Sequence, residues 1–336
     1  MGHINIPIFI PHLGCPNQCI FCNQRFISGT VDFDESIVEA QINDVLSTYL
    51  GKDAEIAFFG GSFTGIDRAL MVRLLDVAQK YVDQGKAKAI RMSTRPDYID
   101  EEIVDILSRY TISCVELGIQ STNDAVLKYL KRGHTAEQSK FAIDMLKSRG
   151  ITFVGQMMIG LPTATLEDEI TCAKFICENG ACACRIYPTL VFEQTELADI
   201  VRKGDYIPLT LNEAVLRSAK VLKVFVQNSV SCLRIGLCES ENLHSEETFV
   251  AGPNHPSIGE LVKSRLFLDN IIELLANSDI SKKIIISCRK GAISQVIGNR
   301  QSNILYLKKM YAFQEIKVVE DDSLKAYDIK IFEKED

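Results

Sequence analysis

The sequence contains no hydrophobic run long enough to cross a membrane. A membrane-spanning helix takes about 20 apolar residues, and no uninterrupted apolar run in these 336 residues approaches that length. The N-terminus also lacks the positively charged stretch, apolar core and small-residue cleavage site of a secretory signal. We therefore expect a cytosolic protein.

Structural disulfides are not expected either, because they rarely persist in a reducing compartment. The 11 cysteines are therefore interpreted as metal ligands and buried apolar residues. With 46% hydrophobic residues, the chain can bury a large core, either as one barrel-sized domain or as one domain with an appendage.

An overall positive charge is missing, but the charge is unevenly distributed. The net charge of −7 argues against nucleic acid as a partner of the whole surface. Residues 281–310, however, contain no Asp or Glu and carry +7, which leaves −14 for the rest. A local basic face on an acidic protein can still bind phosphate. Its seven basic residues are Lys282, Lys283, Arg289, Lys290, Arg300, Lys308 and Lys309.

Short β-rich apolar runs alternate with segments of helical period, and no internal repeat or low-complexity segment stands out. This is the pattern of consecutive βα units around a parallel sheet. Six such units predict an α/β fold, either a partial barrel or an open parallel sheet. Strands are expected at 4–10, 54–59, 88–93, 112–118, 152–159 and 183–189, with helices at 34–50, 66–84, 100–109, 123–131, 136–149 and 165–179.

The alternation ends after residue 190. A long covering segment, a helix at 210–228 and a strand at 230–236 are expected next. The polar stretch that follows is acidic and contains Gly and Pro, which predicts a loop or lid. A small α+β domain completes the chain. The sequence thus predicts three parts: 1–236, 237–258 and 259–336.

Cys15, Cys19 and Cys22 form a CxxxCxxC run, CPNQCIFC, just after the first expected strand. Three thiolates so close together can hold three irons of a 4Fe–4S cluster and leave the fourth iron open for chemistry. A structural cluster or zinc site would normally take a fourth protein ligand, and none follows at ferredoxin or zinc-ribbon spacing. The alternative is three cysteines placed by chance in a buried turn.

Most other unusual motifs also follow directly after an expected strand, where parallel βα folds bind their ligands. Each motif alone has a structural alternative. A glycine pair can form a tight turn, Arg95 and Asp97 can cap a helix, and Glu116 and Gln120 can join a buried polar network. Their common position favours a ligand site. The motifs are GGSFTG with Gly60, Gly61 and Ser62, STRPD with Thr94, ELGIQS, MIGLP with Gly160, and RIYPTL. LKRGHT, with Arg132 and His134, follows an expected helix, and its alternative is an ordinary helix end.

With these motifs the chain resembles a radical S-adenosylmethionine (SAM) enzyme. More narrowly, residues 4–236 are similar to the radical SAM portion of the elongator catalytic subunit family. The resemblance implies a partial (β/α)6 TIM barrel, a 4Fe–4S cluster on the three cysteines, and SAM bound to the open iron through its amino and carboxylate groups. It rests on CPNQCIFC, FFGGSFTG, STRPDYI, VELGIQS, LKRGHT, GQMMIGLP and RIYPTLV.

The resemblance also implies how SAM is bound and used. Reductive cleavage of SAM would give a 5'-deoxyadenosyl radical that abstracts hydrogen from a substrate, with the electron delivered by a donor such as ferredoxin or flavodoxin. The protein positions and shields this cofactor chemistry. The implied contacts are Gly60, Gly61 and Ser62 for the amino group, Thr94, Gln120 and Arg132 for the carboxylate or ribose, and the backbone at Ile159 and Gly160 for the adenine.

The sequence departs from the elongator family in one respect. Members of that family continue into a zinc-binding cysteine segment and an acetyltransferase domain, and neither occurs here, so the acetyl-CoA-dependent reaction is not implied. Cys182 and Cys184 invite a second-metal interpretation, but they share one face of a strand and are expected to be buried structural thiols. His244 and His255, in the acidic loop, are expected to be solvated.

The last segment gives an independent indication of function. KKIIISCRKGAISQVIGNRQSNILYLKKMYAFQEIKVVE predicts strand, helix, turn, helix, strand, which resembles the core of a KH-type RNA-binding module. KH folds clamp backbone nucleotides on a GxxG loop; here the first glycine is Gly298, but Gln301 stands at the fourth position. The RNA candidates are Gly298, Asn299, Arg300 and Lys290. The alternative is a small cap domain whose lysines keep it solvated.

These features predict a radical SAM enzyme that acts on RNA, with tRNA as the expected substrate. One alternative is a porphyrin- or small-metabolite-directed enzyme that resembles oxygen-independent coproporphyrinogen oxidase, although RIYPTLV and the tail argue against it. The other alternative is a cluster-bearing RNA-binding protein without catalysis. The substrate-side residue is not identified by any motif, and Tyr187, Cys238 and Glu239 are the candidates for it.

Overall fold

The computed structural model describes residues 3–10, 13, 15, 19–23, 33–49, 51, 53–237, 245, 247–276 and 282–334. Within these ranges no helix is both long and apolar enough to cross a membrane. Cys238, Glu239 and His244 lie outside the described residues.

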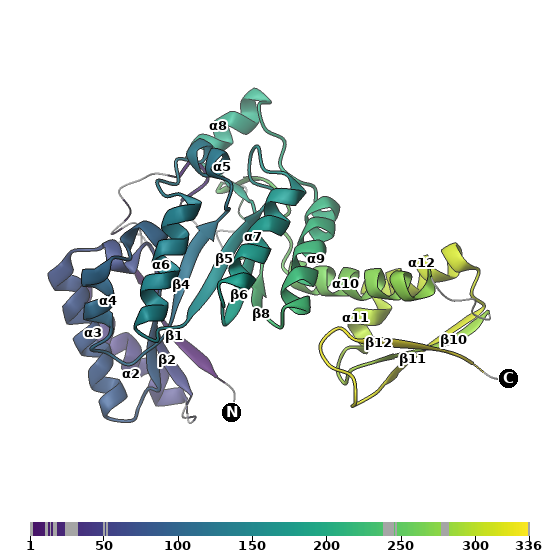
Figure 1. The fold of residues 1–336 in the computed structure, drawn as a ribbon, viewed down its shortest axis with the longest axis horizontal. Helices are drawn as coiled ribbons and strands as arrows, with labels where there is room; N and C mark the ends of the chain where they lie inside the picture. The colour runs from purple at the N-terminus through teal and green to yellow at the C-terminus, as the bar shows by residue number, and fades with distance from the viewer. Residues whose placement is uncertain are drawn as a thin grey trace.

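Seven parallel strands form one sheet that curls into a half-barrel (Figure 1). They cross the sheet in the order β1-β2-β3-β4-β5-β6-β8, and every neighbouring pair is parallel. This confirms the predicted partial barrel, and the strand expected at 230–236 joins it as a seventh member. The strands are β1 (Ile4–Ile10), β2 (Ala54–Gly60), β3 (Ala89–Thr94), β4 (Ile112–Gln120), β5 (Phe153–Ile159), β6 (Ala183–Pro188) and β8 (Ser231–Ile235).

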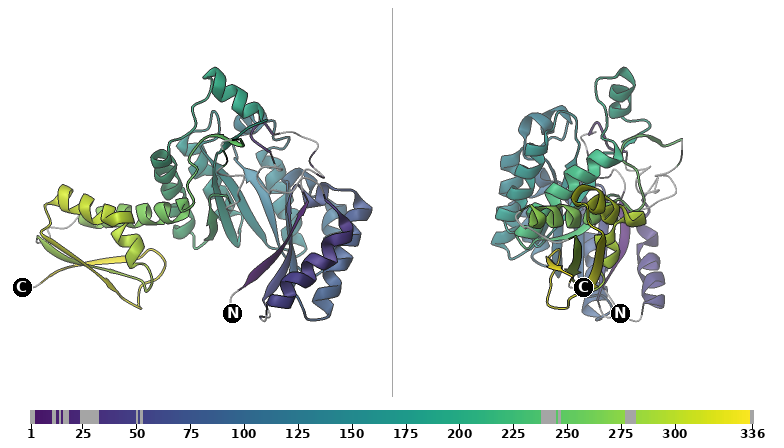
Figure 2. Two further views of the ribbon diagram at one scale, coloured as in Figure 1. Left: turned by 180° about the vertical axis from the view of Figure 1, so that it is seen from behind. Right: turned by 90° about the vertical axis from the view of Figure 1, so that its right-hand side faces the viewer.

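Helices cover the outer face of this sheet (Figures 1 and 2). Several of them begin where the sequence offers a capping side chain: Thr135, Thr165 and Thr210 each form a capping box, which satisfies backbone N–H groups at the helix start. These helices are α2 (Val38–Thr48), α3 (Arg68–Asp83), α4 (Glu101–Leu107), α6 (Ala136–Ser148), α7 (Leu166–Glu178) and α9 (Leu211–Gln227). The short helix α5 (Asp124–Tyr129) lies instead beyond the C-terminal ends of the strands (Figure 1).

The two faces of the sheet carry different side chains because successive residues of a strand point to opposite faces. In β1, Ile6, Ile8 and Ile10 are buried in the apolar core, whereas Pro7 and Phe9 line the interior of the half-barrel. The other strands follow the same alternation. The outward side chains therefore build one large apolar core with the helices, and the inward ones line a cavity.

The segment after β6 is more regular than the sequence indicated. It contains β7 (Val191–Phe192) and α8 (Glu196–Lys203), and α8 lies beyond the C-terminal ends of the strands (Figure 1). The expected lid also contains a strand, β9 (Phe249–Ala251), which pairs antiparallel with β7. Short two-residue pairings of this kind carry too little hydrophobic pattern to be recognised in the sequence.

The C-terminal part has a core of its own and projects from the half-barrel at the end of a long helix, α10 (Ile258–Leu275) (Figures 1 and 2). Ile258, Val262 and Leu266 of α10 belong to the barrel core, and Phe267 and Ile271 to the second core. The three-stranded sheet has the order β11-β10-β12, with β11 parallel and β12 antiparallel to β10. Its elements are β10 (Lys283–Cys288), α11 (Ile293–Ile297), α12 (Ser302–Tyr311), β11 (Glu315–Glu320) and β12 (Ile329–Glu333).

Candidate functional site

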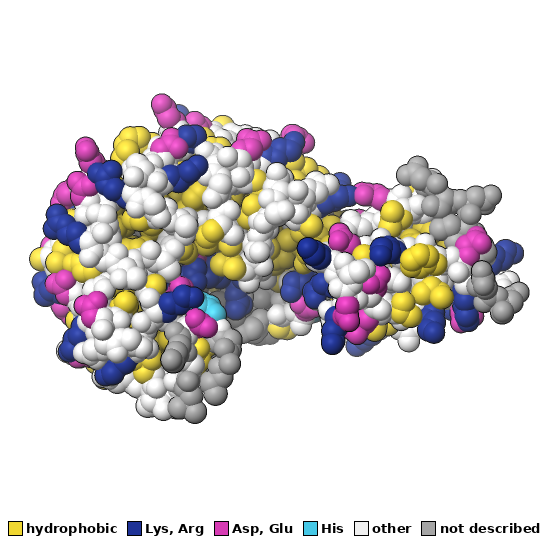
Figure 3. Space-filling view, turned by 60° about the horizontal axis from the view of Figure 1, so that its bottom comes forward, with side chains coloured by type: hydrophobic (Ala, Val, Ile, Leu, Met, Phe, Trp, Pro, Cys, Tyr) yellow, Lys and Arg dark blue, Asp and Glu magenta, His cyan; other side chains and the backbone are white. Residues whose placement is uncertain are grey.

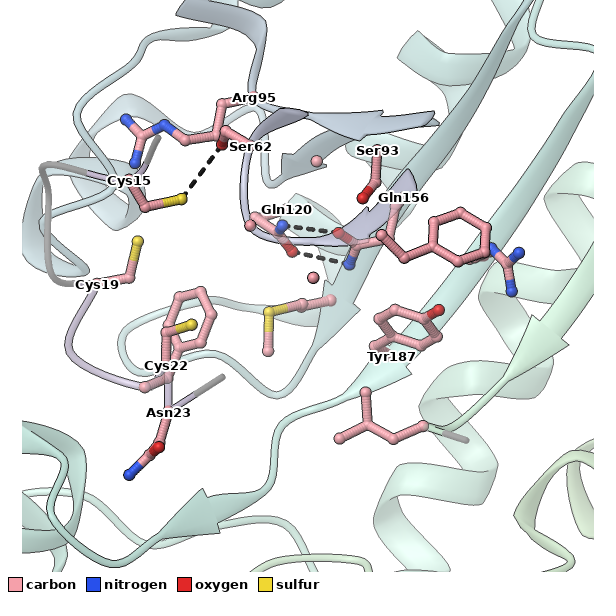
Figure 4. A pocket seen from close by; sticks show the side chains of 18 of the residues that line it. Cys15, Cys19, Cys22, Asn23, Ser62, Ser93, Arg95, Gln120, Gln156 and Tyr187 are labelled. Atoms are coloured by element: carbon pink, nitrogen blue, oxygen red, sulfur yellow. Dashed lines mark hydrogen bonds between the residues drawn. The ribbon is translucent and has the colours of Figure 1, made fainter. Parts of the chain in front are cut away.

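A cavity of about 1020 Å³ fills the interior of the half-barrel. Inward side chains of the seven strands line it, together with the loops at their C-terminal ends. Figure 4 shows that the labelled side chains converge on this space from several strands and from the cysteine loop. This is the location that parallel βα folds use for ligands.

Cys15, Cys19 and Cys22 all line this cavity. Cys19 is buried and the other two are half-buried, and the backbone N–H of Cys22 donates to the carbonyl of Cys19 at 3.0 Å. The sulfur of Cys15 lies 3.3 Å from the hydroxyl of Ser62 (Figure 4). The structure therefore brings the cysteine loop and the loop after β2 together.

Two buried arginines lie beside the thiols. Arg132 donates to the carbonyl of Gly118 at 2.8 Å and to the sulfur of Cys19 at 3.5 Å. Arg95, of which 2% is exposed, binds Asp97 through two hydrogen bonds of 2.9 and 2.7 Å. Burial opposes the charge of Arg95, but Asp97 and the nearby thiols outweigh burial and raise its pKa. These hydrogen bonds therefore fix the positions of both guanidinium groups beside the thiols.

Each arginine also has one buried N–H group without a partner in the described part of the chain, Nη1 of Arg95 and Nε of Arg132. A buried donor left unpaired costs free energy, so such groups indicate an absent acceptor. Two unsatisfied guanidinium groups next to three thiols fit an anionic group that binds at the cysteines.

Glycines open the cavity wall on the same side. The backbone N–H of Gly61 donates to the carbonyl of Ile10 at 2.9 Å, and Gly60 has φ +106°, a conformation that favours glycine. A Cβ at Gly118 would stand 2.7 Å from Nη2 of Arg132. Side chains at these positions would therefore collide with the surrounding structure or fill the cavity.

Gln120 and Thr94 are both buried and reach the cavity lining. Gln120 exchanges two amide hydrogen bonds with Gln156, of 2.7 and 2.8 Å (Figure 4). The hydroxyl of Thr94 lies 2.7 Å from that of Thr64. Both predicted residues are thus at the site, although the hydroxyl of Thr94 already has a protein partner.

Ile159 and Gly160 are not part of the cavity lining. The N–H of Gly160 donates to Glu169 at 2.6 Å, and its carbonyl accepts from the hydroxyl of Tyr206 at 2.5 Å. Met158 lines the cavity instead. Strand alternation turns the side chain of Met158 inward and that of the fully buried Ile159 outward. The contact expected from the sequence is with the backbone at Ile159 and Gly160, and it stays a prediction.

Deeper in the half-barrel, the predicted polar residue Glu116 belongs to an ionic network. It binds Arg185 through hydrogen bonds of 2.7 and 3.0 Å, and it lies 3.0 Å from Arg91. Arg91 also pairs with Glu55 at 3.2 Å. In Figure 3, which is turned toward the N-terminal ends of the strands, basic, acidic and histidine side chains gather around a hollow. The structural alternative for Glu116 is therefore the one observed.

Several cavity residues were not identified from the sequence. They share one signal that could have found them: each lies at an inward position of an expected strand, two or four residues from another inward residue. Tyr187, a candidate from the sequence, is among the lining residues. The residues not identified include Phe9, Phe59, Gln156, Arg185 and Arg234.

Cys182 and Cys184 belong to no group of three candidate metal ligands in the part of the chain that the structure describes. No three His, Cys, Asp or Glu side chains among the described residues are close enough for one metal ion; this does not apply to a four-iron cluster, in which each thiolate binds a different iron. Cys184 is buried as predicted, and its thiol contacts that of Cys232. Cys182, by contrast, is exposed, because it lies just before the N-terminal end of β6. The prediction that it is buried was wrong.

The residues predicted to bind RNA lie on and around the turn between α11 and α12. Gly298 has φ +82°, and Arg300 and Gln301 also have positive φ, at 50° and 62°. Gln301, at the fourth position of the GxxG pattern, thus has a backbone that glycine favours. Gly298 and Arg300 line a shallow hollow, whereas Asn299 and Lys290 do not. His255, in the expected lid, accepts the N–H of Ser257 at 3.0 Å and so has a structural contact.

Two family profiles match the half-barrel and the first part of α10. The profile of the radical SAM superfamily matches residues 9–176, and that of the Radical_SAM C-terminal domain matches residues 182–267. An uncharacterized protein of Methanocaldococcus jannaschii is 28% identical over 225 residues, which cover 62% of this chain and 68% of that protein. The tRNA uridine(34) acetyltransferase of the same organism is 33% identical over 146 residues, 42% of this chain and 27% of its own length.

Two further proteins relate to the elongator group. Elongator complex protein 3 of Schizosaccharomyces pombe is 33% identical over 153 residues, which cover 44% of this chain and 28% of that protein. The structure of Methanocaldococcus infernus Elp3 has a TM-score of 0.60 at 23% identity, and the match covers 79% of this chain and 62% of that one. The matched region thus spans about a quarter of the acetyltransferase and elongator relatives, and the solved structure supports the same fold.

Proposed function

The chain belongs to the radical SAM superfamily, and on that premise we propose that it modifies RNA, with tRNA as the substrate. Members of this superfamily are enzymes that use a 4Fe–4S cluster and SAM. The observation that carries the cofactor chemistry is the cavity in which three thiols lie next to two buried arginines with unpaired N–H groups. RNA as the substrate rests on the tRNA-modifying relative and on the basic window at 281–310.

The cavity contains residues suited to the cluster and residues suited to SAM. Cys15, Cys19 and Cys22 would hold three irons, and the open glycine backbone at Gly60 and Gly61 would admit the amino group of SAM. The remaining residues for SAM are Ser62, Thr94, Gln120 and Arg132. When bound, the cluster and SAM supply a 5'-deoxyadenosyl radical for hydrogen abstraction.

The chain itself contributes charge balance and shielding. A cluster with three thiolates and a carboxylate concentrates negative charge, and Arg95 and Arg132 would offset it where water is largely excluded. Arg132 is the residue proposed for the carboxylate, because its Nε has no partner in the described structure. The core behind the sheet closes the outer side, so reactants would enter from the open side of the half-barrel.

Two features support RNA as the substrate. The relatives with matching barrels include a tRNA uridine(34) acetyltransferase, and the small domain carries the basic window at 281–310. Lys290, Asn299 and Arg300 are all exposed there and are proposed to contact phosphates, with the backbone at Gly298. An electron donor of the ferredoxin or flavodoxin type would deliver the electron for the cleavage of SAM.

The test is mass spectrometry of tRNA nucleosides from cells with and without the protein. A modified nucleoside that disappears on deletion, and returns with the wild-type gene but not with Cys19→Ala, is expected. Cys177→Ala serves as the matched control, because Cys177 lies on α7, outside the cavity lining. Identical nucleoside profiles in both strains would overturn the assignment to tRNA.

A further inference from the structure

Arg185 and Arg234 lie side by side on the inner wall of the half-barrel. They are register partners on β6 and β8, and both line the cavity. Like charges at neighbouring positions of paired strands repel each other. The arrangement is therefore favourable only where carboxylates or a bound anion offset both charges.

Among the described residues, the carboxylates deep in the half-barrel pair with Arg91 and Arg185 but not with Arg234. Glu116 binds Arg185 and also pairs with Arg91, and Glu55 pairs with Arg91. Arg91 and Arg185 thus take up both carboxylates. The guanidinium of Arg234 has no hydrogen bond or ion pair in the described structure, and it is exposed to the solvent that reaches the cavity.

The opposite edge of the half-barrel presents an aromatic surface. Phe9 and Phe59 are register partners on β1 and β2, with ring centroids 6.5 Å apart, and both line the same cavity. Phe9 is 37% exposed. Aromatic side chains left open in a cavity are suited to stacking on a planar base.

We propose that Arg234, together with Arg185, binds a phosphate group of the substrate, so that the cavity takes up a single nucleotide whose base reaches the Phe9 and Phe59 side. One uncompensated positive charge matches one phosphodiester group and is too little for a macrocycle with several carboxylates. The RNA origin of this nucleotide rests on the proposed function, whereas the anion site rests on the geometry of the wall.

The experiment is anaerobic calorimetry of the cluster-reconstituted protein with SAM present. Each ribonucleoside 5'-monophosphate is compared with its nucleoside. The monophosphate is expected to bind roughly 10- to 100-fold more tightly, as charged hydrogen bonds to one phosphate allow. Arg234→Gln is expected to remove this preference and leave nucleoside affinity unchanged, and Arg234→Lys to retain part of it. Arg149→Gln, which alters an exposed arginine paired with Asp105 on the outer surface, is the control.

Equal affinity of wild type for monophosphate and nucleoside, or a preference that survives Arg234→Gln, would overturn the proposal. Binding of coproporphyrin through Arg234 without binding of any monophosphate would overturn it as well. The proposed function has a separate readout, 5'-deoxyadenosine release on reduction. If Arg234→Gln releases 5'-deoxyadenosine and has lost the preference for the monophosphate, the anion site is confirmed. If the wild type releases no 5'-deoxyadenosine, the enzyme function is refuted, and the comparison of monophosphate with nucleoside still tests the anion site.

Discussion

The Nη1 atom of Arg132 lies 3.5 Å from the sulfur of Cys19, and both side chains are buried. The two residues are 113 positions apart in the sequence. The contact ties the cysteine loop to the turn after α5 and places a positive charge where an anionic group would bind.

Arg132→Gln is therefore expected to weaken SAM binding at least about tenfold, since hydrogen bonds to charged groups contribute roughly 1.5–3 kcal/mol. Arg132→Lys should recover only part, because lysine keeps the charge and loses the planar fork of donors. Anaerobic calorimetry on cluster-reconstituted protein measures both. Unchanged affinity in Arg132→Gln would contradict the role given to this residue, and Arg149→Gln controls for general loss of surface charge.

The amide pair of Gln120 and Gln156 is expected to stabilise the inner wall. Gln156→Ala leaves the buried amide of Gln120 without its two hydrogen bonds to Gln156. The free energy of unfolding should therefore fall by about 1–3 kcal/mol. Urea titration followed by circular dichroism measures this difference. Gln84→Ala, at the exposed end of α3, should change stability by less than about 0.5 kcal/mol. Equal stability of the two variants would show that the pair contributes nothing.

Among the described thiols outside the cysteine loop, that of Cys182 is expected to react at the lowest pH. A hydrogen bond from the Cys114 thiol lowers the pKa of Cys182 to about 6, whereas burial raises the pKa of Cys177 to about 11. Only the thiolate is alkylated. The iodoacetamide reaction of Cys182 should therefore accelerate as the pH rises through about 6 and level off above it, while Cys177 stays slow at neutral pH.

Peptide mass spectrometry after timed labelling measures these rates residue by residue. Cys114→Ala is expected to move the midpoint for Cys182 upward, because it removes the hydrogen-bond donor. A midpoint near the ordinary thiol value of about 8.5 in the wild type would contradict the assigned contact.

The basic tail gives a prediction on salt dependence. Lys290→Gln and Arg300→Gln should each weaken tRNA binding and lower the slope of log affinity against log salt concentration by about one, as expected for a lost phosphate contact. Lys174→Gln, an exposed lysine on the outer helix α7, should leave the slope unchanged. Fluorescence anisotropy with labelled tRNA measures the slopes, and identical slopes in all four proteins would exclude the tail as the RNA surface.

The βα order of the fold could be predicted from the sequence because each strand and helix has its own local period. The same locality explains which site residues were found. Cys15, Cys19 and Cys22 form a contiguous motif, and their position after β1 fixes the end of the barrel at which they lie.

The contacts across strands could not be predicted in this way. Glu116 and Arg185 are 69 residues apart, and they meet only because the curvature and register of the sheet place both on its inner face. Cys182 was expected to be buried as part of a strand, because composition does not define where β6 begins. The strand begins at Ala183, so Cys182 lies just outside it and is exposed.

The most direct test of the central claim is anaerobic reconstitution with iron and sulfide, followed by dithionite reduction in the presence of SAM. The wild-type protein is expected to show a 4Fe–4S absorption and electron paramagnetic resonance signal, together with release of 5'-deoxyadenosine. Cys15→Ala, Cys19→Ala and Cys22→Ala should each abolish the release, and Cys177→Ala should retain it. A reconstituted wild-type protein that carries the cluster and forms no 5'-deoxyadenosine would contradict the account.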